Sequence, residues 1–342
     1  MKLLITGGCG FIGFNLVKYL KSKYKSHINI DIIDNLSRSG SERNLFILKK
    51  NRLFNNFYKI DCSDNIKLLK NIKNKKYEII FHLAAQVAVT SSIINPILDF
   101  KSNLLSTLNI INYIKNSKNK PLLIFSSTNK VYGNLKYLKL KENKKRYVSI
   151  PDSINENFNL NFNTPYGCSK GSSDQYITDF SKTYDFKSVV LRLSCIYGTF
   201  QNGIEDQGWI NWIIKKSLNK KTINFYGNGK QVRDILNIDD LCNLFDKLIN
   251  NINIISSNTY NVGGSIKNSI SLIELVDILD QENLFSKYKV NDWRNDDQKY
   301  YVSNISKIKK DFGWSPQVGI KKGIREMILW LQDQKNKKYL SN

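Results

Sequence analysis

The sequence predicts an α/β fold, with a doubly wound parallel sheet in a first domain and a smaller second domain. A glycine-rich turn follows the first short apolar segment, and short apolar segments then alternate with longer amphipathic ones as far as residue 128. Parallel strands need helical crossovers, so this alternation favours a parallel sheet. With 342 residues, of which 41% are hydrophobic, the chain could form one large or two small domains and has ample core for an enzyme with a pocket.

The first predicted strand lies at residues 2–6 and leads through a glycine turn into a helix over residues 14–24. Glycine lets the backbone approach a pyrophosphate without a Cβ in the way, and the helix directs its free N–H groups at the phosphates. We therefore predict a dinucleotide-binding turn made of Gly7, Gly10, Phe11, Ile12 and Gly13.

The second predicted strand, at residues 28–34, ends in Asp34, about 20 residues past the last glycine. A carboxylate there would bind the hydroxyls of the adenosine ribose and repel a 2′-phosphate, which favours NAD over NADP. Asn35 belongs to the same predicted site, and Arg38 argues mildly for the phosphate-bearing cofactor.

Three more strands are predicted at residues 55–61, 77–85 and 121–128, with a long helix over residues 97–116. In open α/β sheets the ligand lies at the carboxyl ends of the strands. Side chains near these ends, and one on the helix, complete the predicted cofactor site: Asp61, Cys62, Ala84, Gln86 and Asn103.

Tyr166 and Lys170 follow a Thr-Pro helix start and lie four positions apart, so they share a helical face. A nearby ammonium favours the phenolate, which would make the tyrosine a base. An ordinary surface pair has the same spacing, so the pair alone does not decide between the two interpretations.

The formal net charge of +23 leaves nucleic-acid binding open, but the lysines are scattered in short clumps along the chain. We therefore expect no specific nucleic-acid partner, and a charge that helps to attract an anionic small substrate. Five separated cysteines and two histidines predict neither a disulfide framework nor a metal site, with His82 as a satisfied core residue. No segment has the roughly 18 apolar residues of a membrane span, and no signal peptide is predicted, so a reduced cytoplasmic setting is expected.

Four motifs together resemble the extended short-chain dehydrogenase/reductases, which modify nucleotide sugars. They are TGGCGFIG at residues 6–13, HLAAQ at 82–86, SSTNKVYG at 126–133 and PYGCSK at 165–170. The resemblance covers nearly the whole chain and implies a Rossmann domain with NAD as cofactor. The runs SSTNKVYGNL, YGCSKGSSDQY, DQGWINW and NGKQVRDIL are further similar to the branch that inverts carbon 2 of a CDP-linked dideoxyhexose, in the synthesis of surface polysaccharide sugars.

The resemblance implies that Tyr166 is the catalytic base, and that Lys170 lowers its pKa and holds the nicotinamide ribose. Thr128 would hydrogen-bond to the reacting oxygen, with Ser126 and Ser127 as alternatives. The residues implied for substrate binding are Gln86, Thr128, Asn129, Arg233 and Arg294. The two arginines would clamp the diphosphate, because their planar groups match two phosphate oxygens.

Two departures from the family pattern narrow the reaction. Asn129 and Lys130 stand where dehydratases of this superfamily carry an Asp-Glu pair, which argues against removal of water. Cys195 stands where many 4-epimerases carry an asparagine that contacts substrate. A 4-epimerase or 4-reductase of another nucleotide sugar stays open as an alternative, as does a catalytically silent NAD-bound or RNA-binding protein.

We expect an NAD-binding domain over residues 1–193, with a return segment near residues 231–250, and a nucleotide-sugar-binding domain over residues 194–342. The polar segment at residues 133–160 is expected to be a long loop without secondary structure over the active site. The tail at residues 334–342 is expected to fray, and Trp209 and Trp212 could line the sugar pocket or belong to the core. The family expectation is a homo-oligomer, a dimer or a tetramer.

Overall fold

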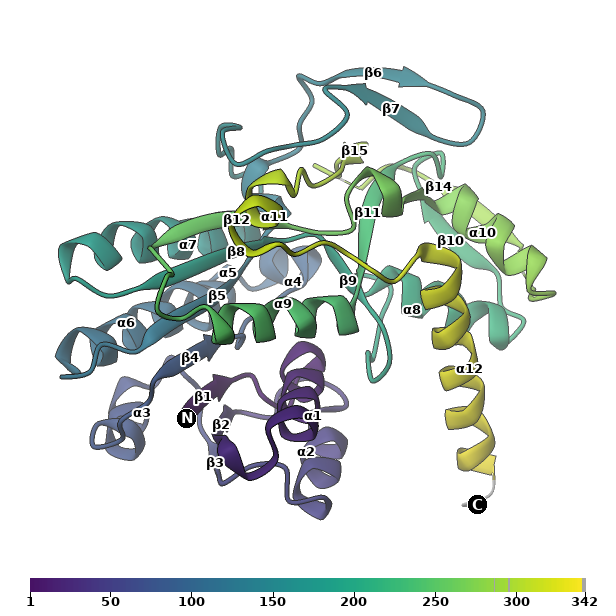
Figure 1. Cartoon of the computed structure of the whole chain (residues 1–342). Helices are drawn as coiled ribbons and strands as arrows, with labels where there is room; N and C mark the ends of the chain where they lie inside the picture. The colour runs from purple at the N-terminus through teal and green to yellow at the C-terminus, as the bar shows by residue number, and fades with distance from the viewer. Residues whose placement is uncertain (286, 295, 340–342) are drawn as a thin grey trace. The chain divides into compact units, whose positions relative to one another are not determined.

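The computed structural model describes residues 1–285, 287–294 and 296–339 (Figure 1). The chain forms two compact units, each built from separate segments. The first unit comprises Met1–Val131, Phe162–Arg192 and Cys242–Tyr260. The second comprises Tyr132–Asn161, Leu193–Leu241 and the described part of Asn261–Asn342.

A seven-stranded sheet organises the first unit, in the order β12-β8-β5-β4-β1-β2-β3. The pairs around β1 are parallel, as predicted. Strand order reverses beside β1, which lies between β2 and β4, and in such sheets ligands bind outside the carboxyl ends at this point. The strands are β1 (Lys2–Thr6), β2 (Asn29–Asp34), β3 (Asn56–Lys59), β4 (Ile79–His82), β5 (Leu122–Thr128), β8 (Ser188–Leu193) and β12 (Asn258–Val262).

Helices cover this sheet because its strands are apolar on both faces; β4, for example, is buried at every residue. Helix α6 contacts both α3 and α7, whereas α1 contacts α2 (Figure 1). The helices of this unit are α1 (Phe11–Tyr24), α2 (Ser41–Lys50), α3 (Asn65–Ile72), α4 (Val89–Ile94), α5 (Pro96–Phe100), α6 (Ser106–Asn116), α7 (Pro165–Thr183) and most of α9 (Ile238–Asn250), with a short 3-10 turn η1 (Lys25–His27). Leu4, Ile33, Ile80, Leu123 and Phe125 belong to its core.

The predicted strands up to residue 128 are all present, with ends that differ by a few residues. The long helix predicted at residues 97–116 is instead interrupted by a π-helical turn, η2 (Lys101–Leu105). There the hydroxyls of Ser106 and Thr107 donate to the carbonyl of Asn103, at 3.2 and 2.6 Å. Such side-chain bonds compete with the regular backbone pattern, and π-helical turns are frequent at functional sites.

The second unit contains a four-stranded sheet in which β11 pairs with β9, β13 and β15, and a parallel pair of β10 with β14. Its remaining elements are η3 (Asn129–Tyr132, at the junction of the two units), β6 (Lys139–Glu142), β7 (Tyr147–Ile150), β9 (Cys195–Tyr197), α8 (Trp209–Leu218), β10 (Ile223–Tyr226), β11 (Val232–Asn237), η4 (Ile266–Asn268), β13 (Ser269–Ser271), α10 (Leu272–Gln281), β14 (Tyr288–Asn291), β15 (Tyr300–Tyr301), α11 (Ser306–Phe312) and α12 (Ile320–Tyr339).

Three expectations about this unit need correction. The segment at residues 133–160 is not structureless, because β6 and β7 form an antiparallel hairpin with Lys139 opposite Ile150. It also belongs to the second unit, although it was assigned to the first domain. The tail at residues 334–342 does not fray from its start, because α12 continues to Tyr339. Residues 340–342 lie outside the described part.

The predicted return segment, near residues 231–250, also differs. Strand β11 pairs within the second unit, and only from Cys242 onward does the chain belong to the first unit. The strand that completes the seven-stranded sheet is β12, which follows α9. In the part of the chain that the structure describes, no helix combines the length and the apolar character needed to cross a membrane.

Candidate active site

The turn between β1 and α1 has the shape of a phosphate cradle. Gly7 has φ +68°, and a Cβ at this position would lie 2.7 Å from the Ala84 amide nitrogen. A Cβ on Gly13 would lie 2.3 Å from the Gly7 carbonyl oxygen. Both positions therefore require glycine. The N-cap of α1, Gly10, provides no side chain to bond the first N–H groups of the helix, so these groups fit an anionic pyrophosphate.

Asp34 lies at the carboxyl end of β2, beside this turn. Its carboxylate accepts hydrogen bonds from the backbone N–H groups of Cys9, at 2.9 Å, and Leu36, at 2.8 Å. Burial raises the pKa of Asp34, while the backbone bonds act in the opposite direction. The acid thus ties the glycine turn to the end of the second strand, in the position expected of a ribose ligand.

Other residues of the predicted cofactor site also lie at or near strand ends of the first unit. The Asn35 amide donates to the Asp61 carboxylate at 2.8 Å. The carbonyl oxygen of the buried Cys62 accepts from Asn109 at 2.9 Å. The Ala84 N–H donates to the Thr6 hydroxyl at 3.2 Å. The first bond joins the carboxyl ends of β2 and β3, the second joins the end of β3 to α6, and the third joins the ends of β4 and β1.

Gln86 and Asn103 are used in contacts within the protein. The Gln86 backbone N–H donates to the Asn103 side-chain oxygen at 2.9 Å. The side-chain amide of Gln86 donates to the Ala88 carbonyl at 2.8 Å, and its oxygen accepts from the Ala88 N–H. Asn103, almost fully buried, ties the loop after β4 to the helices behind it. Their roles toward cofactor and substrate stay predictions.

Tyr166 occupies the first turn of α7, as its local sequence predicts. Thr164 is the N-cap, and its hydroxyl accepts from the Gly167 N–H at 3.0 Å, with Pro165 at the first helical position. A Cβ on Gly167 would approach the Lys130 carbonyl oxygen to 3.0 Å. This glycine therefore lets the start of α7 pack closely against the chain that leaves β5.

The hydroxyl of Tyr166 hydrogen-bonds to the hydroxyl of Thr128, at the carboxyl end of β5. Burial raises the pKa of Tyr166 to about 12, and the bond from Thr128 acts in the lowering direction. The neighbouring serines are engaged elsewhere, because Ser126 donates to the His82 carbonyl and Ser127 to the Asp174 carboxylate. Among the three candidates, the structure therefore brings Thr128 to the tyrosine.

Lys170 lies one helical turn after Tyr166, and its environment corrects one expectation. Its ammonium lies 4.1 Å from the centre of the Phe125 ring, and its side chain is almost completely buried. Burial lowers the pKa of Lys170 to about 7, against the raising influence of Asp99 and Asp174. The pKa of Tyr166 is raised rather than lowered, and the cation that counteracts this shift is Arg38.

Residues 4–327 match the family described as GDP-mannose 4,6 dehydratase. The chain belongs to this family. It is 39% identical over 338 residues to a CDP-paratose 2-epimerase of Salmonella typhi, covering 96% of this chain and 99% of the relative.

Solved structures of the same fold support the assignment. A UDP-glucose 4-epimerase of Thermotoga maritima, with UDP-glucose, superposes with a TM-score of 0.81 at 25% identity, covering 98% of this chain and 100% of the other. A dTDP-glucose 4,6-dehydratase of Bacillus anthracis, in complex with NAD, gives a TM-score of 0.80 at 25% identity and 98% coverage of both chains. The expected extended short-chain dehydrogenase/reductase is thus confirmed.

The two residues after Thr128, where the resemblance predicts an Asp-Glu pair in dehydratases, are Asn129 and Lys130. Asn129 is buried, and its side-chain oxygen accepts from the Thr128 hydroxyl at 3.4 Å. The Lys130 N–H donates to the same hydroxyl at 3.3 Å. Neither residue supplies a carboxylic acid that could protonate a leaving hydroxyl.

The two arginines predicted to clamp a diphosphate lie in the second unit, each beside a carboxylate. Arg233 donates to Asp297 at 2.9 Å. The guanidinium of Arg294 bonds to Asp206 at 2.9 Å and stacks over the Tyr226 ring, 4.0 Å from its centre. A stacked guanidinium keeps a fixed plane, which suits recognition of a phosphate edge.

The two tryptophans that were expected either to line the sugar pocket or to belong to the core pack against the hydrophobic core of the second unit: Trp209 and Trp212. The indole N–H of Trp209 donates to the Cys195 sulfur at 3.4 Å.

His82, in the first unit, is a satisfied core residue as expected, since its ring nitrogens bond to the hydroxyls of Thr6 and Thr107. Within the described ranges, no cluster of His, Cys, Asp or Glu side chains could hold a metal ion.

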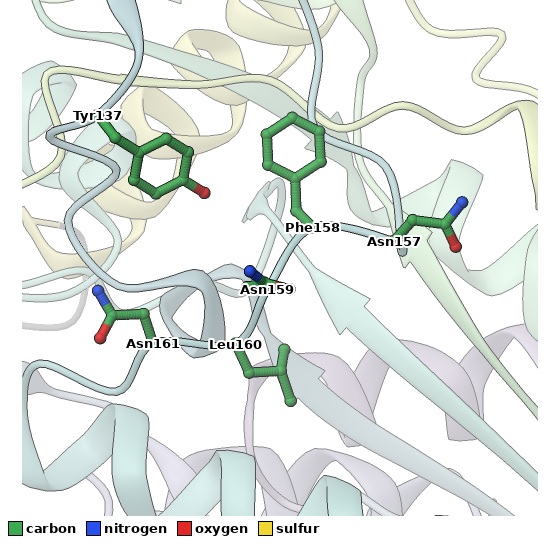
Figure 2. Close-up of a pocket in the computed structure, with 6 residues that line it drawn as sticks. All are labelled: Tyr137, Asn157, Phe158, Asn159, Leu160 and Asn161. Atoms are coloured by element: carbon green, nitrogen blue, oxygen red, sulfur yellow. The ribbon is translucent and has the colours of Figure 1, made fainter.

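A shallow hollow of about 570 Å³ lies on the second unit (Figure 2). It is lined by Tyr137 and by residues 157–161, which follow the β6–β7 hairpin. Figure 2 shows the rings of Tyr137 and Phe158 together with the side-chain amides of Asn157, Asn159 and Asn161. This hollow includes none of the residues predicted to bind cofactor or substrate.

A group of buried polar residues near Lys170 was not predicted from the sequence. Asp99 and Ser169 hydrogen-bond to each other, and Asp174 forms a two-bond ion pair with Arg192. Three of these residues are charged side chains at no more than 5% exposure, which is rare for such groups unless they are paired. The only sequence signal is that Asp99 precedes Asn103 by one helical turn.

Proposed function

We propose that the protein is an epimerase that inverts carbon 2 of a CDP-linked dideoxyhexose, converting CDP-paratose to CDP-tyvelose. The observation that carries this proposal is the hydrogen-bonded pair of Thr128 and Tyr166, followed by Asn129 and Lys130 instead of acids. Such a site can move a hydroxyl proton but has no acid for removing water. The CDP-paratose 2-epimerase relative, at 39% identity over nearly its whole length, supports the choice of substrate.

The cofactor is NAD, as in the related dehydratase structure that contains it. The glycine turn, the uncapped start of α1 and the Asp34 carboxylate fit its pyrophosphate and adenosine ribose. A carboxylate in this place disfavours the 2′-phosphate of NADP. Bound at this site, NAD would supply reversible hydride transfer, by which the sugar carbon could be oxidised and then reduced on the opposite face.

The chain's own residues supply orientation and proton transfer. We assign Tyr166 as the base that removes the proton of the sugar hydroxyl and later restores it. Thr128 donates a hydrogen bond to the reacting oxygen. Lys170 holds the hydroxyls of the nicotinamide ribose. Because the environment of Tyr166 raises its pKa to about 12, the base needs further stabilisation of the phenolate, and Arg38 and Thr128 contribute to it in this structure.

In the second unit, we assign Arg233 and Arg294 to the diphosphate of the nucleotide sugar. Both side chains are partly shielded, which strengthens a charge-assisted bond. The high net charge of +23 would draw the anionic substrate toward the protein. We expect the enzyme to act in the cytoplasm, as a homo-oligomer, in the synthesis of surface polysaccharide sugars such as those of the lipopolysaccharide O-antigen.

The deciding experiment is incubation of the purified protein with CDP-paratose, with the sugar product analysed by NMR. We expect CDP-tyvelose to form without added oxidant. Conversion of a UDP-hexose, with CDP-paratose unchanged, would support the alternative 4-epimerase or 4-reductase instead. Mass spectrometry of the small molecules released on denaturation should find NAD, because the reaction regenerates it in every cycle.

A second class of function is a catalytically silent NAD-bound or RNA-binding protein. The intact Thr128, Tyr166 and Lys170 set argues against it. Salt-sensitive RNA binding that persists in a Tyr166→Phe variant, in a protein that turns over no nucleotide sugar, would favour this second class.

A further inference from the structure

A buried carboxylate lies behind the helix turn that carries Tyr166 and Lys170. Asp99, on α5, is 1% exposed. One of its oxygens accepts from the Ser169 hydroxyl at 2.5 Å, and the other accepts from the Asn103 amide at 3.1 Å. The same Asn103 amide also donates to Ser169 at 3.0 Å. Asp99 is therefore held in place by the residue next to Lys170 in sequence.

The surroundings of Lys170 contain two acids, but only one of them is neutralised by another residue. Asp174, on the same helix, is paired with Arg192 of β8 at 2.8 and 3.2 Å and accepts from Ser127 at 3.0 Å. Among the described residues, the hydrogen-bond donors to Asp99 are the uncharged groups of Ser169 and Asn103. Burial raises the pKa of Asp99, and the Ser169 bond and the positive charge of Lys170 act in the lowering direction.

The other neighbours of Lys170 carry no compensating negative charge. From β5 it faces the Phe125 ring. On β4, the pKa of His82 is lowered to about 3, first by burial and then by the charge of Lys170, so this ring is neutral. Tyr166, one turn earlier on α7, is held protonated by its raised pKa. A buried ammonium needs a counter-charge. Of the two acids that act on Lys170 in the described part of the chain, Asp99 is the one without a cationic hydrogen-bond partner.

We propose that Asp99 is a positioning residue of the active site, whose buried carboxylate balances the charge of Lys170 and anchors the first turns of α7 through Ser169. This inference rests on the proposed NAD-dependent function, in which Lys170 acts as a cation. It also explains the π-helical turn η2, because that irregular turn allows Asn103 to reach Asp99, Ser169 and the Gln86 backbone from one position.

The direction of the pH effect follows from the signs of the charges. The negative charge of Asp99 raises the pKa of Lys170 and also raises that of Tyr166. Removing this charge therefore makes Lys170 lose its proton at lower pH, and makes Tyr166 ionise at lower pH. A residue that only supported the fold would reduce stability and activity without moving either titration.

The first test is the affinity of the protein for NAD as a function of pH, which needs no sugar substrate. We expect the affinity of the wild type to fall as Lys170 loses its proton. In Asp99→Asn this fall should move to lower pH by about one unit, whereas Asp99→Glu should keep the wild-type position. Lys170→Met should show no such fall. Asp179→Asn, which removes an exposed acid from the same helix, controls for general electrostatics.

A folded Asp99→Asn variant whose pH profile matches the wild type would overturn the proposal. Failure of the wild type itself to bind NAD would instead contradict the proposed function, so the two failures are distinguishable.

A second test asks whether the charges of Asp99 and Lys170 balance each other, and it works even if Asp99→Asn alone does not fold. Urea unfolding at pH 7 should give a lower midpoint for Lys170→Met, because the variant leaves a buried carboxylate without its counter-charge. The double variant Asp99→Asn/Lys170→Met should recover part of this loss. A double variant that is less stable than Lys170→Met would show that the two charges do not balance each other.

Discussion

The hydroxyls of Thr128 and Tyr166 hydrogen-bond to each other, joining the end of β5 to the first turn of α7. This bond lowers the pKa of a tyrosine that burial otherwise raises to about 12. Thr128→Val keeps the shape but removes the hydroxyl. We expect turnover to fall about 100-fold or more, and the acidic limb of kcat/KM to move to higher pH, because the phenolate loses a donor. Thr128→Ser should restore both, and an unmoved acidic limb in Thr128→Val would contradict this role.

Replacement of the base itself gives the sharpest activity prediction. Tyr166→Phe keeps the ring that packs at the start of α7 and removes the group that accepts the proton. We expect epimerisation to be lost, with NAD still released from the protein on denaturation. Turnover like that of the wild type would remove Tyr166 from the catalytic role.

Cofactor choice should depend on Asp34. In Asp34→Ala the N–H groups of Cys9 and Leu36 lose their acceptor, so we expect stability to fall by about 1–3 kcal/mol. NAD affinity should weaken about tenfold, and the preference for NAD over NADP should shrink. Asp64→Ala, which removes the acceptor at the N-cap of α3, controls for the stability loss and should keep the cofactor preference. An Asp34→Ala variant that binds NADP no better relative to NAD than the wild type would contradict the assignment.

The second unit allows a test of diphosphate binding. Arg294→Gln removes the charge but keeps a side chain that can stack on Tyr226, and we expect CDP to bind about tenfold more weakly by calorimetry. Asp206→Asn removes the present partner of Arg294, whereas Glu205→Gln removes an acid next to it that accepts from Tyr226 instead. Of these two acid variants, only Asp206→Asn should alter the affinity for CDP. Equal effects of the two acid variants would show a general charge effect.

The buried His82 should make stability depend on pH. Its pKa in the folded protein is about 3, far below the ordinary value of 6.5. Its contribution is therefore fully present above pH 6.5 and is lost as pH falls toward 3, because only the unfolded chain takes up the proton. When the pH falls from 6.5 to 5, the free energy of unfolding measured in urea should decrease by about 2 kcal/mol less in His82→Gln than in the wild type. His27→Gln, at the exposed second histidine, should follow the wild type.

Features of the fold that depend on neighbours in sequence could be predicted. The glycine turn, the acid at the end of β2 and the Thr-Pro start of α7 each follow from the chemistry of a few adjacent residues. The environment of the Lys170 side chain could not be predicted in this way. It includes Phe125 and Asp99, which lie 45 and 71 positions earlier in the sequence and act on Lys170 only when α5, α7 and β5 pack together.

The hairpin β6–β7 was missed for a different reason. Its strands are short, rich in lysine and largely exposed, so they show little of the apolar alternation by which strands are recognised. The domain division was imperfect because the chain passes between the two units several times. A single boundary near residue 193 cannot describe such an arrangement.

The place of β12 in the sheet has a consequence for how the protein is made. β12 pairs with β8 yet follows it by 64 residues, all of which the ribosome must add before the sheet is complete. Until then the nascent chain exposes the unpaired backbone of β8, a template on which other chains can assemble. We therefore expect truncation before Asn258 to yield aggregates rather than a working cofactor-binding fragment, so expression of this protein requires the chain to be synthesised beyond β12.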